Sequence, residues 1–358
     1  MAKGSKEELH APMALYRKYR PKEFSEIRGD RESVAVLEVA VKKGEIAHAY
    51  LFAGGRGTGK TSTARILARA LKVSEKDIYE MDAASNRGID EIRELREGVS
   101  TLPFESPYKF YIIDEAHALT KDAGGALLKT LEEPPAHVVF VLATTELDRV
   151  PETIQSRCQV FRFKKPSHET LKKLAMDVAK KEGAALDAAG AAMIALVGEG
   201  SFRDTLGVLQ KVLTISDDKK LSEEEIAKVI GAPPGKLINA FLAALAKKDI
   251  EEAILQFHQA IDNGADPQIF LLLTVAKVRA VLLMRFAPKM KALLKEQFGD
   301  DDLMFIESLA RVNPSAGAAI NSQMLAEFLT ALIETPRSPL PQVPLELALY
   351  RCFTSPQT

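Results

Sequence analysis

The sequence predicts an α/β fold, in which a parallel five-stranded sheet with helices on both faces precedes two all-helical units. Three observations lead to this prediction. Five short β-rich segments alternate with helical patterns between residues 49 and 163, a glycine-rich segment follows the first of them, and β-rich segments disappear after residue 165. Strands that are separated by crossover helices form parallel sheets with both faces covered. We therefore expect one mixed domain followed by a helical remainder.

The expected strands are apolar or β-branched runs bounded by turn-forming residues. They lie at 49–52, 78–81, 109–113, 138–142 and 160–163. Helical patterns cover about 61–71 and about 120–132. Pro134-Pro135 ends the second helix, because the residue before a proline disfavours helical geometry.

The domain boundaries are predicted from changes of pattern and from glycine and proline residues. At 358 residues the chain exceeds the length of about 250 residues at which a single core stops growing. Two prolines flanked by glycines at 231–235 cannot continue a helix and indicate a linker. The predicted parts are a polar leader or expression tag (1–12), the sheet domain (13–165), a small helical domain (166–232) and a C-terminal helical domain (233–358).

The apolar run 269–284 in the last part indicates a helix that is apolar on most of its faces. Such a helix is buried by its neighbours. These neighbours belong either to its own domain or to partner subunits.

Composition restricts the class of protein. A net charge of −1 provides no overall basic field, so any DNA contact must come from a local patch or from several subunits together. Two cysteines form neither a disulfide framework nor a complete four-ligand zinc site. No run approaches the roughly 18 apolar residues of a spanning helix, and the N-terminus lacks the apolar stretch of a signal peptide. We expect a cytoplasmic protein without a membrane partner.

A glycine-rich octet, a P-loop, indicates a nucleotide site. It lies after the strand 49–52 and before a helix, and its residues are Gly54, Gly55, Arg56, Gly57, Thr58, Gly59, Lys60 and Thr61. Gly54 and Gly59 allow the tight turn whose N–H groups surround phosphate. Lys60 reaches the β- and γ-phosphates and the Thr61 hydroxyl ligates Mg²⁺. Ser62 completes this part of the predicted ATP-binding set.

Two carboxylates, Asp114 and Glu115, end the apolar strand 109–113. Asp114 is expected to hold Mg²⁺, directly or through water, and Glu115 to polarise the water that attacks the γ-phosphate. Two acids that cap a helix are the alternative. With His117, the same residues spell a helicase box, but that class needs a second sheet, for which the helical remainder leaves no room. We interpret His117 as a local packing or hydrogen-bonding residue, with a coupling element as the alternative.

Three further residues are candidates for the same chemistry. Thr145 follows the fourth strand, where it would orient the attacking water or cap the next turn. Arg157 lies just before the fifth strand, far from its own nucleotide, and would reach a neighbouring subunit's γ-phosphate or form a surface ion pair. Arg203 lies near a helix start and would report the phosphates or remain solvated.

Several longer segments have a pattern in common with one family. They are 14–24, 48–52, 81–85, 126–135 and 156–158. With these segments the chain resembles the AAA+ ATPases, and within them the gamma/tau family of bacterial DNA polymerase III clamp loaders, over about residues 13–358.

The resemblance implies roles for individual residues. Tyr16 and Arg17 lie in the segment that binds the nucleotide base. Lys60 and Thr61 bind ATP-Mg²⁺, Asp114 and Glu115 serve hydrolysis, Arg157 acts on a neighbour and Arg203 senses nucleotide. The helical part 166–232 is then a lid, and 233–358 is a collar that holds the subunits together.

The resemblance also implies a pentameric assembly with other clamp-loader subunits that opens a sliding clamp and places it on primer-template DNA. Candidate phosphate contacts are Asn86, Arg87 and Lys121, each of which could instead be solvated surface. The family's four-cysteine zinc module is replaced by the bridge 72–77, so no zinc is expected. The chain stops soon after the collar, which suggests a gamma-like or shortened form.

Two other functions remain open on the sequence. One is a different AAA+ motor, such as a branch-migration helicase. The other is a scaffold that binds ATP without turnover.

Overall fold

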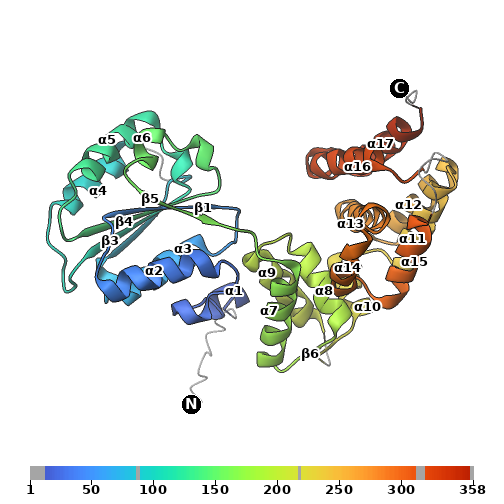
Figure 1. The fold of residues 1–358 in the computed structure, drawn as a ribbon, viewed down its shortest axis with the longest axis horizontal. Helices are drawn as coiled ribbons and strands as arrows, with labels where there is room; N and C mark the ends of the chain where they lie inside the picture. The colour runs from blue at the N-terminus through green and yellow to red at the C-terminus, as the bar shows by residue number, and fades with distance from the viewer. Residues whose placement is uncertain (1–12, 86–88, 217–218, 312–318, 355–358) are drawn as a thin grey trace, which may run out of the picture. The chain divides into compact units, whose positions relative to one another are not determined.

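The computed structural model describes residues 13–85, 89–216, 219–311 and 319–354 (Figure 1). Its described residues form two compact units. The first comprises residues up to 171 together with 200–207, and the second comprises 172–199 and the residues from 208 onward. The division at 165 and 232 that we expect from the sequence remains a prediction.

A parallel sheet in the order β2-β3-β4-β1-β5 forms the centre of the first unit. Its strands are β1 (Ala49–Gly54), β2 (Ile78–Asp82), β3 (Lys109–Asp114), β4 (Val138–Thr144) and β5 (Gln159–Phe163). Three of the strands, β1, β3 and β4, are buried along almost their whole length. The predicted fold class is thereby confirmed.

Helices cover both faces of this sheet (Figure 1). The helical elements are α1 (Leu15–Lys18), η1 (Phe24–Glu26), α2 (Arg31–Lys43), α3 (Lys60–Ala70), η2 (Glu75–Asp77), α4 (Ile89–Val99), η3 (Ala116–Ala118), α5 (Lys121–Glu132), η4 (Leu147–Arg149) and α6 (Glu152–Gln155). Alternation along β3 divides the core. Phe110 and Ile112 pack with α2 and α3, whereas Tyr111 and Ile113 pack with α4 and α5.

The second unit is almost entirely helical. Its elements are α7 (His168–Lys181), α8 (Ala188–Val197), α9 (Phe202–Ile215), α10 (Glu223–Ile230), α11 (Gly235–Ala246), α12 (Ile250–Asp262), α13 (Pro267–Phe286), η5 (Pro288–Met290), α14 (Lys291–Gln297), α15 (Asp300–Ala310), α16 (Ser322–Glu334), η7 (Thr335–Arg337) and α17 (Val343–Thr354). Helices α7 and α9 each have residues in both units. A two-residue parallel pair, β6 (Ala185–Leu186) with β7 (Lys220–Leu221), is an addition that the sequence did not predict.

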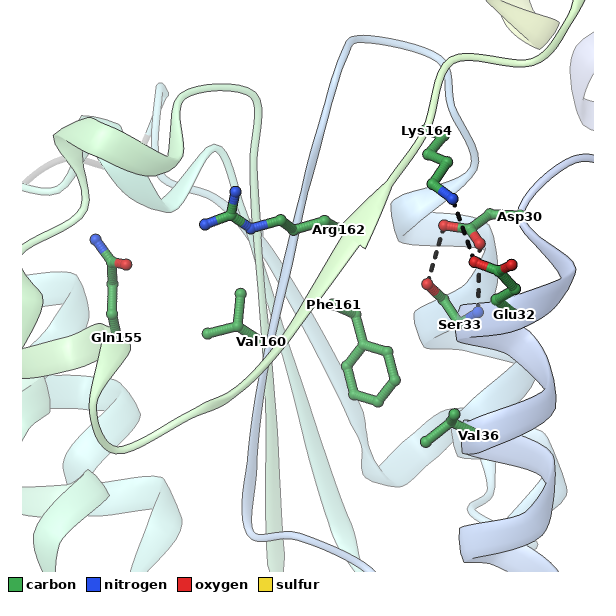
Figure 2. A pocket seen from close by; sticks show the side chains of 9 residues that line it. All are labelled: Asp30, Glu32, Ser33, Val36, Gln155, Val160, Phe161, Arg162 and Lys164. Atoms are coloured by element: carbon green, nitrogen blue, oxygen red, sulfur yellow. Dashed lines mark hydrogen bonds and ion pairs between the residues drawn. The ribbon is translucent and has the colours of Figure 1, made fainter.

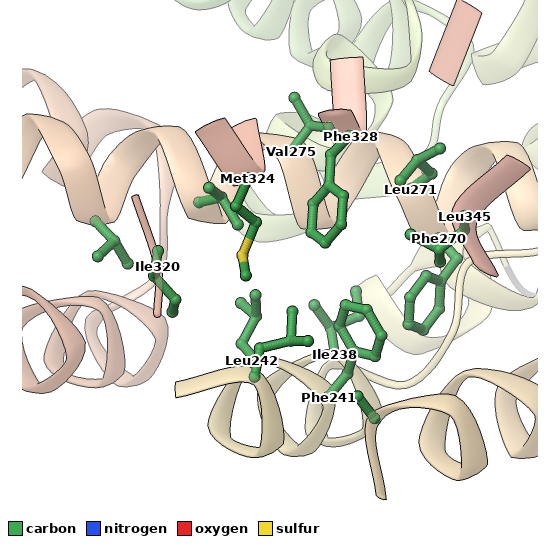
Figure 3. Close-up of a cluster of buried hydrophobic side chains, with 14 of the residues drawn as sticks. Ile238, Phe241, Leu242, Phe270, Leu271, Val275, Ile320, Met324, Phe328 and Leu345 are labelled. Atoms are coloured by element: carbon green, nitrogen blue, oxygen red, sulfur yellow. The ribbon is translucent and has the colours of Figure 1, made fainter. Parts of the chain in front are cut away.

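Helix α13 contains the predicted apolar run and is buried within its own unit. It contacts α11, α15 and α16. Phe270 on α13 packs edge-to-face on Phe241 of α11, with 5.1 Å between ring centroids, and Phe328 of α16 lies close by (Figure 3). Helices of the same chain are therefore sufficient to bury α13.

No single helix in the described part of the chain is both long and apolar enough to cross a membrane. Helices α10 and α11 pass that test only as a pair, which is bent by 75°.

Candidate active site

The predicted nucleotide loop lies where β1 ends and α3 begins. Gly54, Gly57 and Gly59 all have positive φ, and Gly59 caps the N-terminus of α3 in the left-handed conformation. A β-carbon on Gly54 would collide with the Phe163 carbonyl, and one on Gly57 with the Ser201 hydroxyl. Glycine is therefore required at these positions both for conformation and for space.

Lys60, in the first turn of α3, is directed back into this loop. Its Nζ donates to the carbonyl oxygens of Gly54 at 2.8 Å and Gly55 at 2.9 Å, and only 6% of the residue is exposed. Burial lowers the pKa of Lys60, against the opposing charges of Asp114 and Glu115. The ammonium group thus lies among the loop carbonyls, close to both carboxylates.

Thr61 and Asp114 meet across the loop, as the sequence predicts for a shared magnesium site. The Thr61 hydroxyl donates to Asp114 Oδ2 at 2.8 Å. A threonine hydroxyl beside a carboxylate supplies the hard oxygen donors that Mg²⁺ prefers, and the donor set therefore fits this ion.

Glu115 lies at a bend in the backbone directly after β3. Its φ of 50° and ψ of 44° place it in the left-handed region, which is rare for a residue other than glycine. Its carboxylate accepts a hydrogen bond from the Thr145 hydroxyl at 3.0 Å. The structure thus places Glu115 and Thr145 together, and such backbone strain is often found where a side chain has a functional role.

His117 lies beside Glu115 and against the last residue of β4. Its Nδ1 is 3.0 Å from the Thr144 hydroxyl and 3.5 Å from Glu115 Oε2, and its Nε2 is 3.2 Å from Glu146 Oε1. The interpretation of His117 as a local hydrogen-bonding residue agrees with these contacts.

Arg203 approaches the same site from the start of α9, within the first unit. The Phe202 N–H donates to the Gly57 carbonyl at 3.0 Å, which ties this helix start to the nucleotide loop. The Arg203 guanidinium lies 5.6 Å from the centre of the Tyr16 ring, and that of Arg17 lies 5.8 Å from it. Both guanidinium groups are therefore close enough to the Tyr16 ring for cation–π contacts.

Arg20 is a site residue that the sequence analysis missed. Its Nε donates to the Ser62 hydroxyl at 3.0 Å, and burial, together with the nearby charge of Arg65, lowers its pKa. The segment that contains Arg20 is one of those that carry the family resemblance. No spacing rule distinguishes Arg20 from the arginine and lysine residues around it, so only the fold identifies it.

Arg157 is not brought to this site. Its Nη2 pairs with Glu132 Oε1 at 2.6 Å and its Nη1 donates to the Thr153 carbonyl at 2.8 Å. It precedes β5, whose first residue pairs with Tyr50 and whose last pairs with Gly54. The four-residue rise along β5, about 13 Å, therefore separates the end of the sheet near Arg157 from the end that carries the nucleotide loop.

The remaining candidates do not join the site in the described structure. Lys121 is exposed at the start of α5. Asn86 and Arg87 lie outside the described residues. Cys158 and Cys352 are free thiols, and the described residues contain no group of three or more His, Cys, Asp and Glu side chains that could hold a metal ion.

A separate pocket of about 470 Å³ lies beside the edge strand β5 and helix α2 (Figure 2). Arg162 and Lys164 line it together with Asp30 and Glu32, and Lys164 pairs with Glu32 at 3.2 Å. The lining includes no residue of the glycine-rich loop and neither Asp114 nor Glu115. This pocket is therefore distinct from the candidate active site.

Two family models match the chain. Residues 72–167 match the model described as DNA polymerase III, delta subunit, and residues 221–357 match that of DNA polymerase III subunits gamma and tau domain III. The DNA polymerase III subunit gamma of Buchnera aphidicola (subspecies Acyrthosiphon pisum) is 30% identical over 362 residues, which cover 95% of this chain and 98% of that protein. This chain belongs to the DNA polymerase III gamma/tau family. The resemblance that we found in its sequence is confirmed.

Other family members are longer than this chain. The gamma/tau subunit of Mycobacterium tuberculosis is 37% identical over 299 residues, which cover 77% of this chain and 52% of that protein. The tau subunit of Bacillus subtilis is 35% identical over 304 residues, which cover 79% and 54%. The chain thus spans about half the length of these curated relatives.

Solved structures of RuvB from Thermotoga maritima have the same fold. One of them, a Holliday junction branch migration motor, has a TM-score of 0.51 and 21% identity, and covers 63% of this chain and 79% of that one. At this identity the similarity supports the AAA+ fold and carries no argument about function.

Proposed function

We propose that this chain is an ATP-hydrolysing subunit of a DNA polymerase III clamp loader, which opens a sliding clamp and places it on primed DNA. Membership of the gamma/tau family supports the role in a clamp loader, and the geometry around the nucleotide loop supports ATP hydrolysis. The observation that carries the proposal is the meeting of two pairs, Thr61 with Asp114 and Thr145 with Glu115, at the carboxyl ends of neighbouring strands.

The residues of the loop would bind the phosphates. Backbone N–H groups between Gly54 and Thr61, at the N-terminus of α3, favour negative charge, and Lys60 is placed to exchange its loop carbonyls for phosphate oxygens. Thr61 and Asp114 would hold Mg²⁺, which neutralises the charge that develops on the phosphates. Tyr16, Arg17 and Arg203 would close over the nucleotide.

Glu115 would act on the attacking water. A carboxylate that accepts the Thr145 hydrogen bond at one oxygen keeps a second oxygen free to accept a proton. Thr145 would thus orient Glu115 and, through it, the water. Strands β3 and β4, which precede these two residues, are buried in the sheet, and this fixes the positions of both side chains.

Arg157 would act on the site of a neighbouring subunit. It lies at the opposite end of the strands from its own loop, at a partly exposed position, and it carries a guanidinium that can bind phosphate oxygens. A pentameric assembly with companion subunits would supply that neighbour. Lys121 and, outside the described residues, Asn86 and Arg87 would contribute DNA phosphate contacts.

The test uses the complete assembly with its clamp and primer-template DNA. We expect ATP turnover that rises when both are present. The variant Glu115→Gln should still bind ATP and should lose roughly 10²- to 10⁴-fold in hydrolysis, the usual contribution of a general base. Glu38→Gln, an exposed glutamate on α2, is the matched control and should leave turnover unchanged.

Two outcomes would contradict the proposal. If wild-type protein releases no phosphate with clamp and primed DNA present, the chain is a scaffold that binds ATP without turnover. If DNA junctions stimulate turnover without the clamp, a branch-migration motor is the better assignment.

A further inference from the structure

We propose that His117 is a positioning residue for hydrolysis, which holds the Thr144-Thr145 end of β4 against Glu115. This inference rests on the proposed ATPase function. It concerns the histidine that the sequence singled out as part of a helicase-like box, to which the nucleotide chemistry gives no role.

The hydrogen bonds around the imidazole assign its protonation. The Glu146 carboxylate only accepts, so His117 Nε2, at 3.2 Å from it, carries the proton. The Thr144 hydroxyl lies 3.0 Å from Nδ1 and donates to it, so Nδ1 is the acceptor of this pair. The Thr144 oxygen accepts in turn from the Glu146 N–H at 3.0 Å. The imidazole N–H, the Thr144 hydroxyl and the Glu146 N–H each therefore have an acceptor.

The imidazole lies where its hydrogen bonds can fix the position of Glu115. Thr144 is fully buried at the end of β4, and His117 is 12% exposed, so these hydrogen bonds form in surroundings that exclude most water. Thr145 follows Thr144 directly, and its hydroxyl donates to Glu115. Fixing Thr144 and Glu146 on either side therefore fixes Thr145 and, through it, the Glu115 carboxylate.

The bend at Glu115 makes this arrangement possible. The left-handed conformation of Glu115 redirects the chain after β3, so that Glu115 and His117 both face the end of β4. The pair of adjacent threonines serves both side chains: Thr144 contacts His117 and Thr145 contacts Glu115. Supporting groups that act through a catalytic side chain commonly change rates without contacting substrate.

Substitutions separate positioning from packing. His117→Gln keeps one donor and one acceptor, whereas His117→Leu keeps the bulk and removes both. In the assembled complex with clamp and primed DNA, we expect kcat for ATP to fall about tenfold or more in His117→Leu, part of the general-base contribution, with KM nearly unchanged. His117→Gln should restore most of the rate. His48→Leu, an exposed histidine before β1, is the matched control and should leave kcat unchanged.

Equal rates in wild type and His117→Leu, or equal losses in the leucine and glutamine variants, would overturn the inference. If the wild-type assembly itself does not turn over ATP, the proposed function fails instead. A second measurement then decides the inference alone. In the full chain labelled with ¹⁵N-histidine, the signal that His117→Gln removes should show a proton on Nε2 and none on Nδ1, and Thr144→Val should shift it. A ring protonated at Nδ1, or a signal that Thr144→Val leaves unchanged, would contradict the hydrogen-bond set.

Discussion

At the scale of single residues, the candidate site depends on backbone conformations that few residues can adopt. Gly57 has a φ of 68° and lies against Ser201, while Glu115 adopts a φ of 50° despite its side chain. Non-glycine residues lose roughly 1–2 kcal/mol in the left-handed region. The loop therefore needs glycine, and the fold must offset the strain at Glu115.

Gly57→Ala tests this requirement. The new β-carbon would meet the Ser201 hydroxyl at a strained φ, so we expect a loss of about 1–2 kcal/mol in the free energy of unfolding, together with weaker ATP binding. Chemical denaturation and nucleotide titration measure the two effects. Gly125→Ala, in α5 with open space around it, should instead stabilise the protein by about 0.5–1 kcal/mol. Unchanged ATP binding in Gly57→Ala would contradict this account of the loop.

The sequence was informative about those site residues that belong to a spaced motif. The octet predicted Lys60 and Thr61, and the strand that ends in two acids predicted Asp114 and Glu115. Arg20 and the partners of His117 could not be found in this way, because they meet the site only through tertiary contacts. The roles of the individual site residues remain predictions that the substitutions above test.

At the scale of elements, the central strands β1, β3 and β4 follow from their apolar runs, since buried parallel strands are apolar on both faces. The short pair β6 and β7 is only two residues long on each side, too short to leave a periodic pattern. The bridge 72–77 has a structural role of its own.

That role depends on Asp77 at the end of η2. Its fully buried carboxylate accepts from the N–H groups of Phe104, Glu105 and Ser106 at 2.6, 3.0 and 2.9 Å. Burial alone would raise the pKa of Asp77, but these hydrogen bonds outweigh it and lower the pKa below the ordinary value of 3.8. The bridge thereby holds the loop between α4 and β3 in place.

Asp77→Asn should therefore destabilise the fold at neutral pH by about 1–2 kcal/mol, because an amide replaces a charged acceptor of three N–H groups. The pKa is depressed in the folded state, so the ionised Asp77 stabilises the fold above an unfolded pKa of about 3.8, and this contribution is lost as pH falls through the folded pKa. Urea denaturation from pH 7 down to about pH 3 measures both. The variant should lack this part of the acid dependence, and an identical pH profile in both proteins would contradict the prediction.

The second unit depends on the packing around α13 (Figure 3). Phe241 is fully buried between Phe270 and Phe328. Phe241→Ala should lower the free energy of unfolding by about 3–5 kcal/mol, the usual loss for a large core aromatic residue. Phe286→Ala, at the exposed end of α13, should change the stability by less than about 0.5 kcal/mol. Denaturant unfolding compares the two, and similar losses would show that this core is not where the unit gains its stability.

At the scale of the whole molecule, the proposed function requires a site that is divided between two subunits. The loop, the two acids and Thr145 meet at one end of the sheet, while Arg157 lies at the other end and pairs with Glu132. Because the net charge is only −1, the proposed DNA contact would come from local patches that several subunits provide together. The sequence indicated Arg157 only weakly, because its triplet with Ser156 and Cys158 is short and its function would depend on another chain.

The division of the site between two subunits is tested most directly by Arg157→Ala in the complete assembly with clamp and primed DNA. We expect each subunit to bind ATP as the wild type does, while phosphate release falls roughly 10³-fold or more, the effect of losing an arginine that acts from a neighbour. Arg351→Ala, an arginine on α17 with its own pairing to Glu327, is the matched control and should keep most of the rate. Full ATPase activity in an assembly in which every copy carries Arg157→Ala would contradict the account.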